Sequence, residues 1–442
     1  MKRKNKQLTN QRPNNYPLEH NNIATTTDGI TISCYINITN PPLTTTQLNT
    51  QKPNTLPTIP LHLLAHNLTQ YDTTITQINI ITHATKTRPT GFGPIYQATY
   101  NPHLFTTTNT IIETIINIEN NLETFNQRKL TTDETIADSI VRTSILATER
   151  LRRKLIDKGY SATMMSYNDI EQYDTLISEA IGQKPFDYDT PNGFNIPNKP
   201  SIIYQIPIEH TFKLPPAKKY TTLTTLTPSN DGNGEIATYV MLHQQLTKFT
   251  PPKEWKKPKN QGDIATNMLP LMMSVPITTS QFKAPTKAGQ MTSVGVFMGE
   301  HEKYREDSVF IDVDSARSQV VYCSVSELFL KCLVLRSVAC GFNVAVIDTT
   351  GVWDRWIREK QLKGVVVVDS ALKLPAGVDV LVTSGRDVSR EGIVSFVQVD
   401  EVPSDSRLSL ESLGGGVHEV VSGFDKVRFV WVVSEQENSW LM

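Results

Sequence analysis

The chain of 442 residues exceeds the usual size of one domain, so we predict two domains, each long enough to bury its own core. Its 43 basic and 44 acidic residues give a formal net charge of -1, which provides no general field that attracts a polyanion. A nucleic-acid partner is therefore disfavoured. No apolar run approaches the roughly 20 residues that cross a bilayer, so the sequence contains no predicted transmembrane helix.

Residues 1–25 form a polar segment with basic residues between Lys2 and Lys6. Because no apolar stretch follows these cations, the segment lacks the pattern of a secretory signal. We predict a basic, disordered tail, a first domain at residues 26–290 and a second domain at residues 291–442. The composition also changes near residue 290, because Thr, Asn and Ile dominate before it and Val, Ser, Gly and Asp dominate after it.

The first domain begins with residues 30–38, in which apolar and polar side chains alternate. This two-residue period predicts a half-buried strand. After a loop rich in Pro and Thr, residues 61–68 carry an apolar face that predicts a helix, and residues 78–81 predict a strand. Later strand patterns are residues 202–208 and the two arms of a predicted hairpin, residues 220–226 and 236–242.

The centre of the first domain, residues 109–182, predicts strand, helix, strand and helix. Residues 111–118 and 162–165 are the two strands. The helix between them ends at Gly159, which can adopt the left-handed cap. Since a crossover helix packs on a sheet, we predict an α/β domain with a mixed sheet. The stripe that should pack on this sheet consists of Ile136, Ile140, Ser144, Ala147, Leu151 and Leu155.

Three helices are predicted to begin with a capping pattern, in which a polar side chain bonds to the amide three residues later. These patterns are Thr131 with Glu134, Asn168 with Glu171, and Ser324 with Glu327.

The second domain alternates short apolar runs with helices, which predicts a Rossmann-like α/β domain containing a parallel sheet. A strand at residues 319–323 leads into a helix that ends at Gly341. Further strands are predicted at residues 344–347, 365–368, 380–382, 393–399 and 427–433.

Three stretches together resemble one known family. They are the arginine-rich helix ending at Lys158-Gly159 with the strand and capped helix after it, residues 61–83 followed by Gly91 and Gly93, and residues 320–350 followed by Trp353. The last stretch contains a helix reading Val-Leu-Arg-Ser-Val-Ala-Cys-Gly. In this order they are similar to EccE, a core component of the type VII (ESX) secretion membrane complex of actinobacteria. None of the three is a catalytic signature.

The resemblance implies a structural subunit without catalytic activity, metal or cofactor. It implies a position on the cytoplasmic face of the inner membrane, beside EccB, the ATPase EccC and EccD. The family usually begins with two membrane-spanning helices, which this sequence lacks. We therefore expect either a gene start farther upstream or a subunit that docks peripherally.

Asp312 and Asp314 are the main candidates for chemistry. Their Asp-x-Asp spacing is the one that some glycosyltransferases use to hold a divalent metal against a sugar-nucleotide. A metal-dependent glycosyltransferase-like enzyme is therefore an alternative function, which a cavity with both carboxylates converging would favour. The structural explanation is that Asp312 and Asp314 follow a strand end and direct their carboxylates into solvent without binding a metal. A soluble binding protein is a third possibility, because membrane helices are missing.

Other candidate sites have a simpler structural explanation. His62 and His66 lie one helical turn apart, but no third ligand accompanies them, so we expect them to face solvent. After the strand ending at Cys323 the chain carries Ser324 and Glu327 in place of glycines, so no phosphate-binding loop is expected.

Cysteine and tryptophan positions suggest core residues or an interface. Cys34, Cys323, Cys332 and Cys340 show no paired metal spacing and are expected to be buried free thiols. Trp353 and Trp356 share one helix face, which fits either a partner surface or the core. The cations at residues 150–154 fit either a docking patch for an acidic partner or a solvated helix end.

Overall fold

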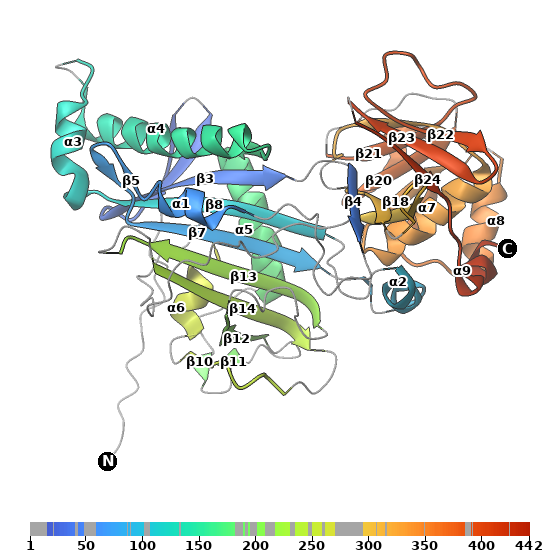
Figure 1. The fold of residues 1–442 in the computed structure, drawn as a ribbon, viewed down its shortest axis with the longest axis horizontal. Coiled ribbons are helices and arrows are strands. Elements are labelled where there is room, and N and C mark those ends of the chain that lie inside the picture. Colours follow the sequence, from blue (N-terminus) through green and yellow to red (C-terminus); the bar gives the residue numbers. More distant parts are fainter. Residues whose placement is uncertain are drawn as a thin grey trace.

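Figure 1 shows the computed structural model as two bodies that lie side by side, each built on a β-sheet with helices packed against it. The predicted α/β class is therefore confirmed. Within the part of the chain that the structure describes, no helix is both long and apolar enough to cross a bilayer. This part comprises residues 16–20, 22–39, 43–47, 59–85, 87–88, 90–100, 107–131, 134–181, 189–190, 193–194, 201–207, 217–229, 235–245, 250–258, 261–269, 295–305, 307–313, 316–348, 350–384, 390, 392–423 and 425–442.

The first sheet has the strand order β1-β2-β3-β8-β7-β13-β14-β12-β11-β10, and β9 pairs with the last residues of β3, beyond those paired with β2. All its described pairs are antiparallel, so the mixed sheet predicted for this domain is wrong. The two strands of the predicted crossover, β8 and β9, run parallel but are separated by β3. The strands are β1 (Tyr16–His20), β2 (Ile23–Thr27), β3 (Thr31–Thr39), β7 (Gln77–Thr85), β8 (Thr107–Asn117), β9 (Ser161–Met164), β10 (Asp189–Thr190), β11 (Gly193–Phe194), β12 (Ser201–Gln205), β13 (Ala217–Thr227) and β14 (Glu235–Gln245).

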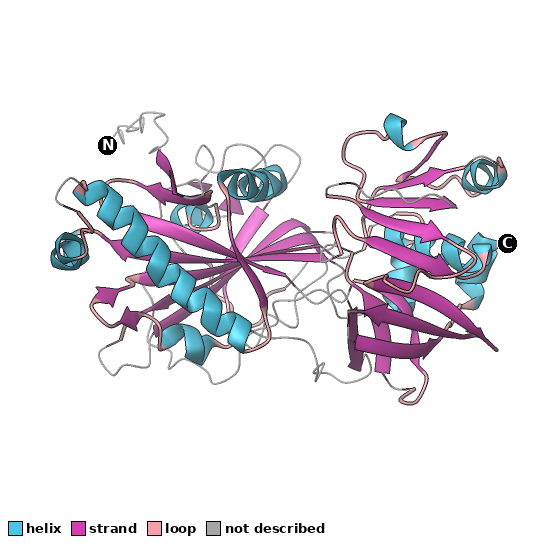
Figure 2. Cartoon of the chain, turned by 90° about the horizontal axis from the view of Figure 1, so that it is seen from above, coloured by secondary structure: helices cyan, strands magenta, loops and turns pink. Residues whose placement is uncertain are grey.

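Helices cover both faces of the first sheet, and Figure 2 shows the longest of them, α4, lying across the strands. One face packs against α1, α3 and α4, and the other against α5 and α6. Tyr35 and Ser33 of β3 are therefore 0% and 4% exposed, so the predicted half-buried strand is buried on both faces. The elements are α1 (Leu61–Ala65), η1 (Glu119–Asn121), α3 (Leu122–Gln127), α4 (Ile136–Asp157), α5 (Tyr167–Ile181), α6 (Gln261–Thr266), and the small hairpin β5 (Thr69–Gln70) with β6 (Thr73–Thr74).

Helix ends and the hairpin follow the sequence patterns more closely than helix starts do. The predicted hairpin is confirmed, with Leu226 of β13 opposite Ile236 of β14. Gly159 ends α4 with a φ of 89°, as predicted. The stripe of α4 is also confirmed, because its members from Ser144 to Leu155 are buried.

Helices α4, α5 and α7 (Glu327–Ala339) begin at other caps than predicted. Thr135 caps α4 by accepting from the Asp138 amide at 3.2 Å, while the Asp138 carboxylate accepts from Thr135. Ser166 and Asp169 form the same reciprocal box ahead of α5, and Ser326 caps α7. For α4 and α5 the physical reason is that aspartate closes the box as well as glutamate does, and for α7 Ser326 lies one turn before the Phe329 amide and caps it without a carboxylate. The wrong predictions are Thr131 with Glu134, Asn168 with Glu171, and Ser324 with Glu327.

The second sheet has the order β19-β18-β20-β21-β17-β22-β23-β24-β15-β16-β4. Its pairs from β19 to β22 are parallel and those from β22 to β4 antiparallel. If the parallel strands β17 to β22 are renumbered 1 to 6 along the chain, their order across the sheet is 3-2-4-5-1-6. This order differs from the Rossmann order 3-2-1-4-5-6. The strands are β15 (Val296–His301), β16 (Asp307–Ile311), β17 (Val320–Ser324), β18 (Val344–Ile347), β19 (Val365–Val368), β20 (Val380–Ser384), β21 (Val394–Gln398), β22 (Leu408–Gly414), β23 (Val417–Ser422) and β24 (Asp425–Val430).

Helix α7 packs on this sheet together with α8 (Val352–Glu359), the short η3 (Ala371–Lys373) follows β19, and α9 (Glu435–Leu441) ends the chain. Strand β19 lies at the sheet edge and is only partly buried, whereas the sequence predicted a strand buried on both sides.

Two segments from the first half of the chain lie in the second domain. Strand β4 (Leu43–Gln47) pairs with β16 and closes one edge of the second sheet. Helix α2 (Gly93–Tyr100), which connects β7 to β8, packs against α7 and α9. Figure 1 shows both elements, coloured blue and teal, within the orange and red body. The boundary predicted near residue 290 assigned both segments to the first domain. We refer to β4, α2 and Arg88 as the interdomain joint.

A buried ion pair between Arg336 of α7 and Glu437 of α9 lies beside α2. Nε and Nη2 of Arg336 each donate to a Glu437 carboxylate oxygen at 2.7 Å. Their side chains are 2% and 0% exposed. The other Arg336 donors reach the carbonyl oxygens of Phe297, Met298 and Val432, so the guanidinium is fully bonded.

Tyr100 links the ion pair to α2, the segment that comes from the first half of the chain. Its ring centroid lies 4.7 Å from the Arg336 guanidinium carbon, and its hydroxyl donates to Glu437 at 2.6 Å. Burial raises the pKa of Tyr100 to about 12, so this hydroxyl stays protonated and able to donate. Tyr96, one turn earlier, accepts from the Phe297 amide at 2.8 Å. Helix α2 is thus bonded to the core of the second domain.

Arg88 holds the entry to α2. Its amide donates to the Ala339 carbonyl at 2.7 Å, at the end of α7. Gly364 lies against its side chain, since a Cβ there would be 2.8 Å from Arg88 Nη1. Arg88 Nη2 donates to the carbonyl oxygens of Gly341 and Phe342 and to Oδ1 of Asn343, at 2.9 to 3.1 Å.

We expect Arg336→Met to lower the free energy of unfolding by about 3–5 kcal/mol, because it leaves the Glu437 carboxylate buried without its partner. Urea unfolding followed by tryptophan fluorescence measures the loss. The control is Arg358→Met, which breaks an ion pair whose arginine is 78% exposed and should have a far smaller effect. Equal losses in the two variants would contradict the assigned role of the buried pair.

We expect Gly364→Ala to destabilise the protein by about 1–2 kcal/mol more than Gly377→Ala, because only the first displaces Arg88 from its acceptors. Both glycines have a left-handed φ, of 92° and 78°, so the backbone strain is matched. Nothing lies within 4 Å of a Cβ placed on Gly377. Thermal unfolding of both variants makes the comparison, and an identical shift would show that the Arg88 contacts add no stability.

Candidate functional site

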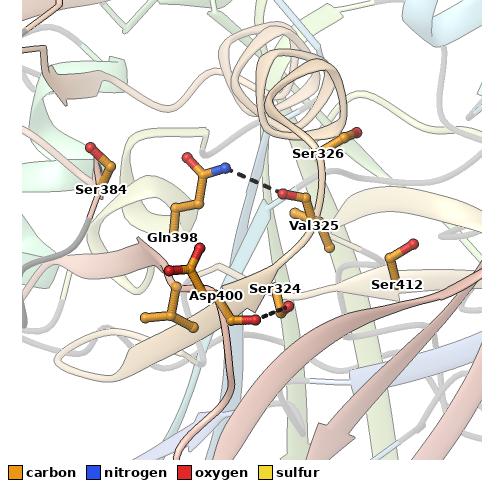
Figure 3. A pocket seen from close by; sticks show the side chains of 8 residues that line it. Ser324, Val325, Ser326, Ser384, Gln398, Asp400 and Ser412 are labelled. Atoms are coloured by element: carbon orange, nitrogen blue, oxygen red, sulfur yellow. Dashed lines mark hydrogen bonds between the residues drawn. The ribbon is translucent and has the colours of Figure 1, made fainter.

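A polar pocket of about 670 Å³ lies outside the carboxyl ends of the parallel strands of the second sheet. Ligands of open α/β sheets bind at this end of the strands. Figure 3 shows Gln398 and Asp400 near its centre, Ser384 on one side and Ser412 on the other. The lining residues are Ser324, Val325 and Ser326 after β17, Ser384 of β20, Gln398, Val399 and Asp400 at the end of β21, and Ser412 of β22.

Two hydrogen bonds hold the floor of the pocket in place. Gln398 Nε2 donates to the Val325 carbonyl at 3.3 Å, and the Ser324 hydroxyl donates to the Asp400 carbonyl at 2.9 Å. Both connect the turn before α7 to the end of β21. The pocket floor is therefore largely pre-formed, as ligand sites usually are.

The charge of the pocket comes from Asp400, because the other described lining side chains are serine, valine and glutamine. Neither a lysine nor an arginine belongs to this described lining. A carboxylate repels phosphate, so the arrangement does not suit a nucleotide pyrophosphate. Hydroxyl, amide and carboxylate groups instead offer hydrogen bonds to a polar ligand without negative charge.

Asp348, at the end of β18, carries a carboxylate that the structure uses internally. Its oxygens accept from the amides of Thr350, Gly351, Trp353 and Asp354 at 2.9 to 3.0 Å. Burial acts to raise the pKa of Asp348, but these hydrogen bonds outweigh it and the net pKa is lowered. The carboxylate thus holds the start of α8 and is not available to a ligand.

The residues predicted for metal binding are not brought together. The side chain of Asp312 is 1% exposed after β16 and does not line the pocket, and Asp314 lies outside the described residues. His62 and His66 are both exposed, in agreement with the expectation that they face solvent. Among the described residues, no group of three or more His, Cys, Asp and Glu side chains has the geometry to hold a metal ion.

The four cysteines are buried free thiols, as predicted. Burial raises the pKa of each thiol, to about 12 for Cys34, Cys332 and Cys340, so none is a thiolate nucleophile at neutral pH. Trp353 and Trp356 are 8% and 5% exposed, which decides between the two predicted roles in favour of the core.

The basic end of α4 makes contacts within the chain. Arg152 and Arg153 share the Glu149 carboxylate, and the Lys154 ammonium donates to Asn67 at 2.6 Å. The Arg150 guanidinium carbon lies 5.4 Å from the ring centroid of Tyr71.

Sequence reasoning missed a buried histidine pair in the first sheet. The Thr221 hydroxyl lies 3.1 Å from His83 Nδ1 and 2.8 Å from His243 Nε2. Burial, followed by the proximity of His243, lowers the pKa of His83 well below its ordinary value. His83 is therefore neutral at pH 7 and serves as a polar core residue.

The pocket residues Ser384, Gln398 and Asp400 were also missed. A usable signal existed, because all three lie at the ends of apolar runs that predicted parallel strands, and those ends meet at one sheet edge. No known protein-family model matches the sequence, and no curated protein is significantly similar to it. Interpretation of function therefore depends on the site geometry and on the resemblance described above.

We expect Asp348→Ala to lower the free energy of unfolding by about 1–2 kcal/mol at pH 7, the range found for a lost helix cap. Because the folded-state pKa is lowered, this contribution is complete above the unfolded value of 3.8 and is lost as the pH falls through the folded-state pKa. Urea unfolding of both proteins from pH 7 downward measures the difference. A difference that stays constant or grows on acidification would be inconsistent with this role.

Proposed function

We propose that the chain is a structural subunit, without catalytic activity, of a type VII (ESX) secretion membrane complex and contributes to protein export. The resemblance to EccE is the sequence basis of this proposal. The observation that carries it structurally is where the EccE-like stretches lie in the fold.

Two of the three stretches that resemble EccE meet at the interdomain joint. The stretch that runs on to Gly91 and Gly93 leads through Arg88 into α2. The stretch Val-Leu-Arg-Ser-Val-Ala-Cys-Gly covers the end of α7 from Val334 and the two residues after it, and it supplies Arg336 and acceptors for Arg88. Gly93 also fits this role, because a Cβ there would collide with the Arg88 carbonyl. A shared pattern that anchors a segment from the first half of the chain in the second body suits a scaffold.

Several titratable groups of the second domain, other than Asp400 in the pocket, support the same proposal. The Arg336 and Glu437 pair, the Asp348 carboxylate and the buried thiols are all engaged in packing or in hydrogen bonds within the chain. A catalytic group needs access to a substrate, and these groups have none.

The proposed subunit has two domains, and we regard the second as a Rossmann-like domain with a rearranged strand order. The subunit would lie on the cytoplasmic face of the inner membrane and contact homologues of EccB, the ATPase EccC and EccD. Energy for export would come from the ATPase. No nucleic acid takes part, in keeping with the net charge of -1.

The pocket favours a second candidate, a soluble binding protein, because a pre-formed concave site is a feature of such proteins. The third candidate, a metal-dependent glycosyltransferase using Asp312 and Asp314, loses support from the burial of Asp312.

Affinity purification of the tagged full chain from detergent-solubilised membranes tests the proposal. We expect mass spectrometry to identify homologues of EccB, EccC and EccD in the purified material. A monomer recovered from the soluble fraction without any of them would overturn the structural-subunit proposal and favour the binding protein.

The matched variants Gly364→Ala and Gly377→Ala extend this experiment. If the rigid joint matters for assembly, Gly364→Ala should reduce recovery of the partners more than Gly377→Ala does. Circular dichroism of both variants verifies that each is folded before recovery is compared.

A further inference from the structure

The pocket at the carboxyl ends of β17, β20 and β21 has the size and chemistry of a small-molecule site. Its volume of about 670 Å³ lies within the range of roughly 300–1,000 Å³ that is typical of ligand pockets. We propose that it binds a neutral, hydroxyl-rich small molecule of sugar size. This ligand is separate from any partner of the proposed secretion subunit.

The acceptors of the pocket are free to receive hydrogen bonds. The Asp400 carboxylate has no hydrogen bond or ion pair within the described part of the chain. Because Gln398 Nε2 is bonded to the Val325 carbonyl, the amide is oriented and its Oε1 remains an acceptor. A ligand must therefore bring donors.

Donors also face the pocket, so the ligand must bring acceptors too. Ser326 begins α7 and accepts from the Phe329 amide, which leaves other amides of the first helical turn without an intrahelical partner. The hydroxyls of Ser384 and Ser412 have no partner among the described contacts and can donate or accept. A hydroxyl group both donates and accepts, so neighbouring hydroxyls on one ligand satisfy both sides of the pocket.

Charge disfavours an anionic ligand. Asp400 repels a phosphate or carboxylate, and no cation in the described lining compensates for it. Val325 and Val399 contribute the apolar surface against which the carbon-bound hydrogens of a sugar ring pack.

Val325 and Val399 allow ligand binding to be measured by NMR. We would label the valine methyl groups of the full chain and follow their signals during titration with D-ribose, D-glucose or myo-inositol. The ligand concentration would reach about 50 mM, which is well above a millimolar Kd. The expected result is a saturable shift at Val325 and Val399 with at least one of these compounds. Val366, which is 36% exposed on the edge strand β19, is the control and should not move.

Two comparisons make the test decisive. D-ribose 5-phosphate should bind at least about tenfold more weakly than D-ribose, a difference of about 1.4 kcal/mol. Asp400→Ala should weaken binding by a similar factor, whereas Asp405→Ala, an exposed carboxylate in the following loop, should leave it unchanged.

Three results would overturn the proposal: no saturable shift with any of the three compounds, tighter binding of the phosphorylated sugar, or equal shifts at Val366. The outcome is independent of the purification experiment, because either proposal can fail while the other holds.

Discussion

The packing of α2 into the second body depends on the buried pair of Arg336 and Glu437. Moving a guanidinium and a carboxylate out of water costs several kcal/mol per ion unless every donor and acceptor is bonded. Here the guanidinium reaches backbone oxygens on β15 and after β24 as well as Glu437 on α9, and Tyr100 donates to the same carboxylate. Besides α7, these groups come from three parts of the chain that are far apart in the sequence: α2, β15 and the stretch from Val432 to Glu437. The pair can be satisfied only when all of them have assembled, so we infer that it contributes more to a unique arrangement than to net stability.

This dependence makes the second domain incomplete without the first half of the chain. Strand β4 closes an edge of the second sheet that would otherwise expose unpaired amides and carbonyls. Helix α2 adds Phe92, Tyr96 and Tyr100 to the apolar core around α7. The chain therefore crosses between its two bodies several times, and the segments β4 and α2 from its first half pack as parts of the second body.

The Arg88 contacts and the polar pocket lie at opposite ends of the parallel strands. Arg88 contacts Asn343 and Gly364, which immediately precede β18 and β19, whereas Ser384 and Gln398 end β20 and β21. The contacts that anchor Arg88 in the second body therefore leave the pocket open. A subunit built in this way can hold α2 in place and still bind a small ligand, because the two sets of contacts lie at opposite strand ends.

The sequence by itself determined the elements whose signal is local. Side-chain periodicity reports which face of a strand or helix is buried, so it located the hairpin of β13 and β14, the stripe of α4 and the run that became β18. It could not choose among closely spaced Ser, Thr and Asp residues for a helix cap, since each can bond to a nearby amide. Only the tertiary structure decided that β8 and β9 flank β3, that the Thr-rich β4 joins the second sheet, and that Gln398 and Asp400 share a pocket. Those outcomes depend on pairing between distant segments, and no local period encodes the partner of a strand.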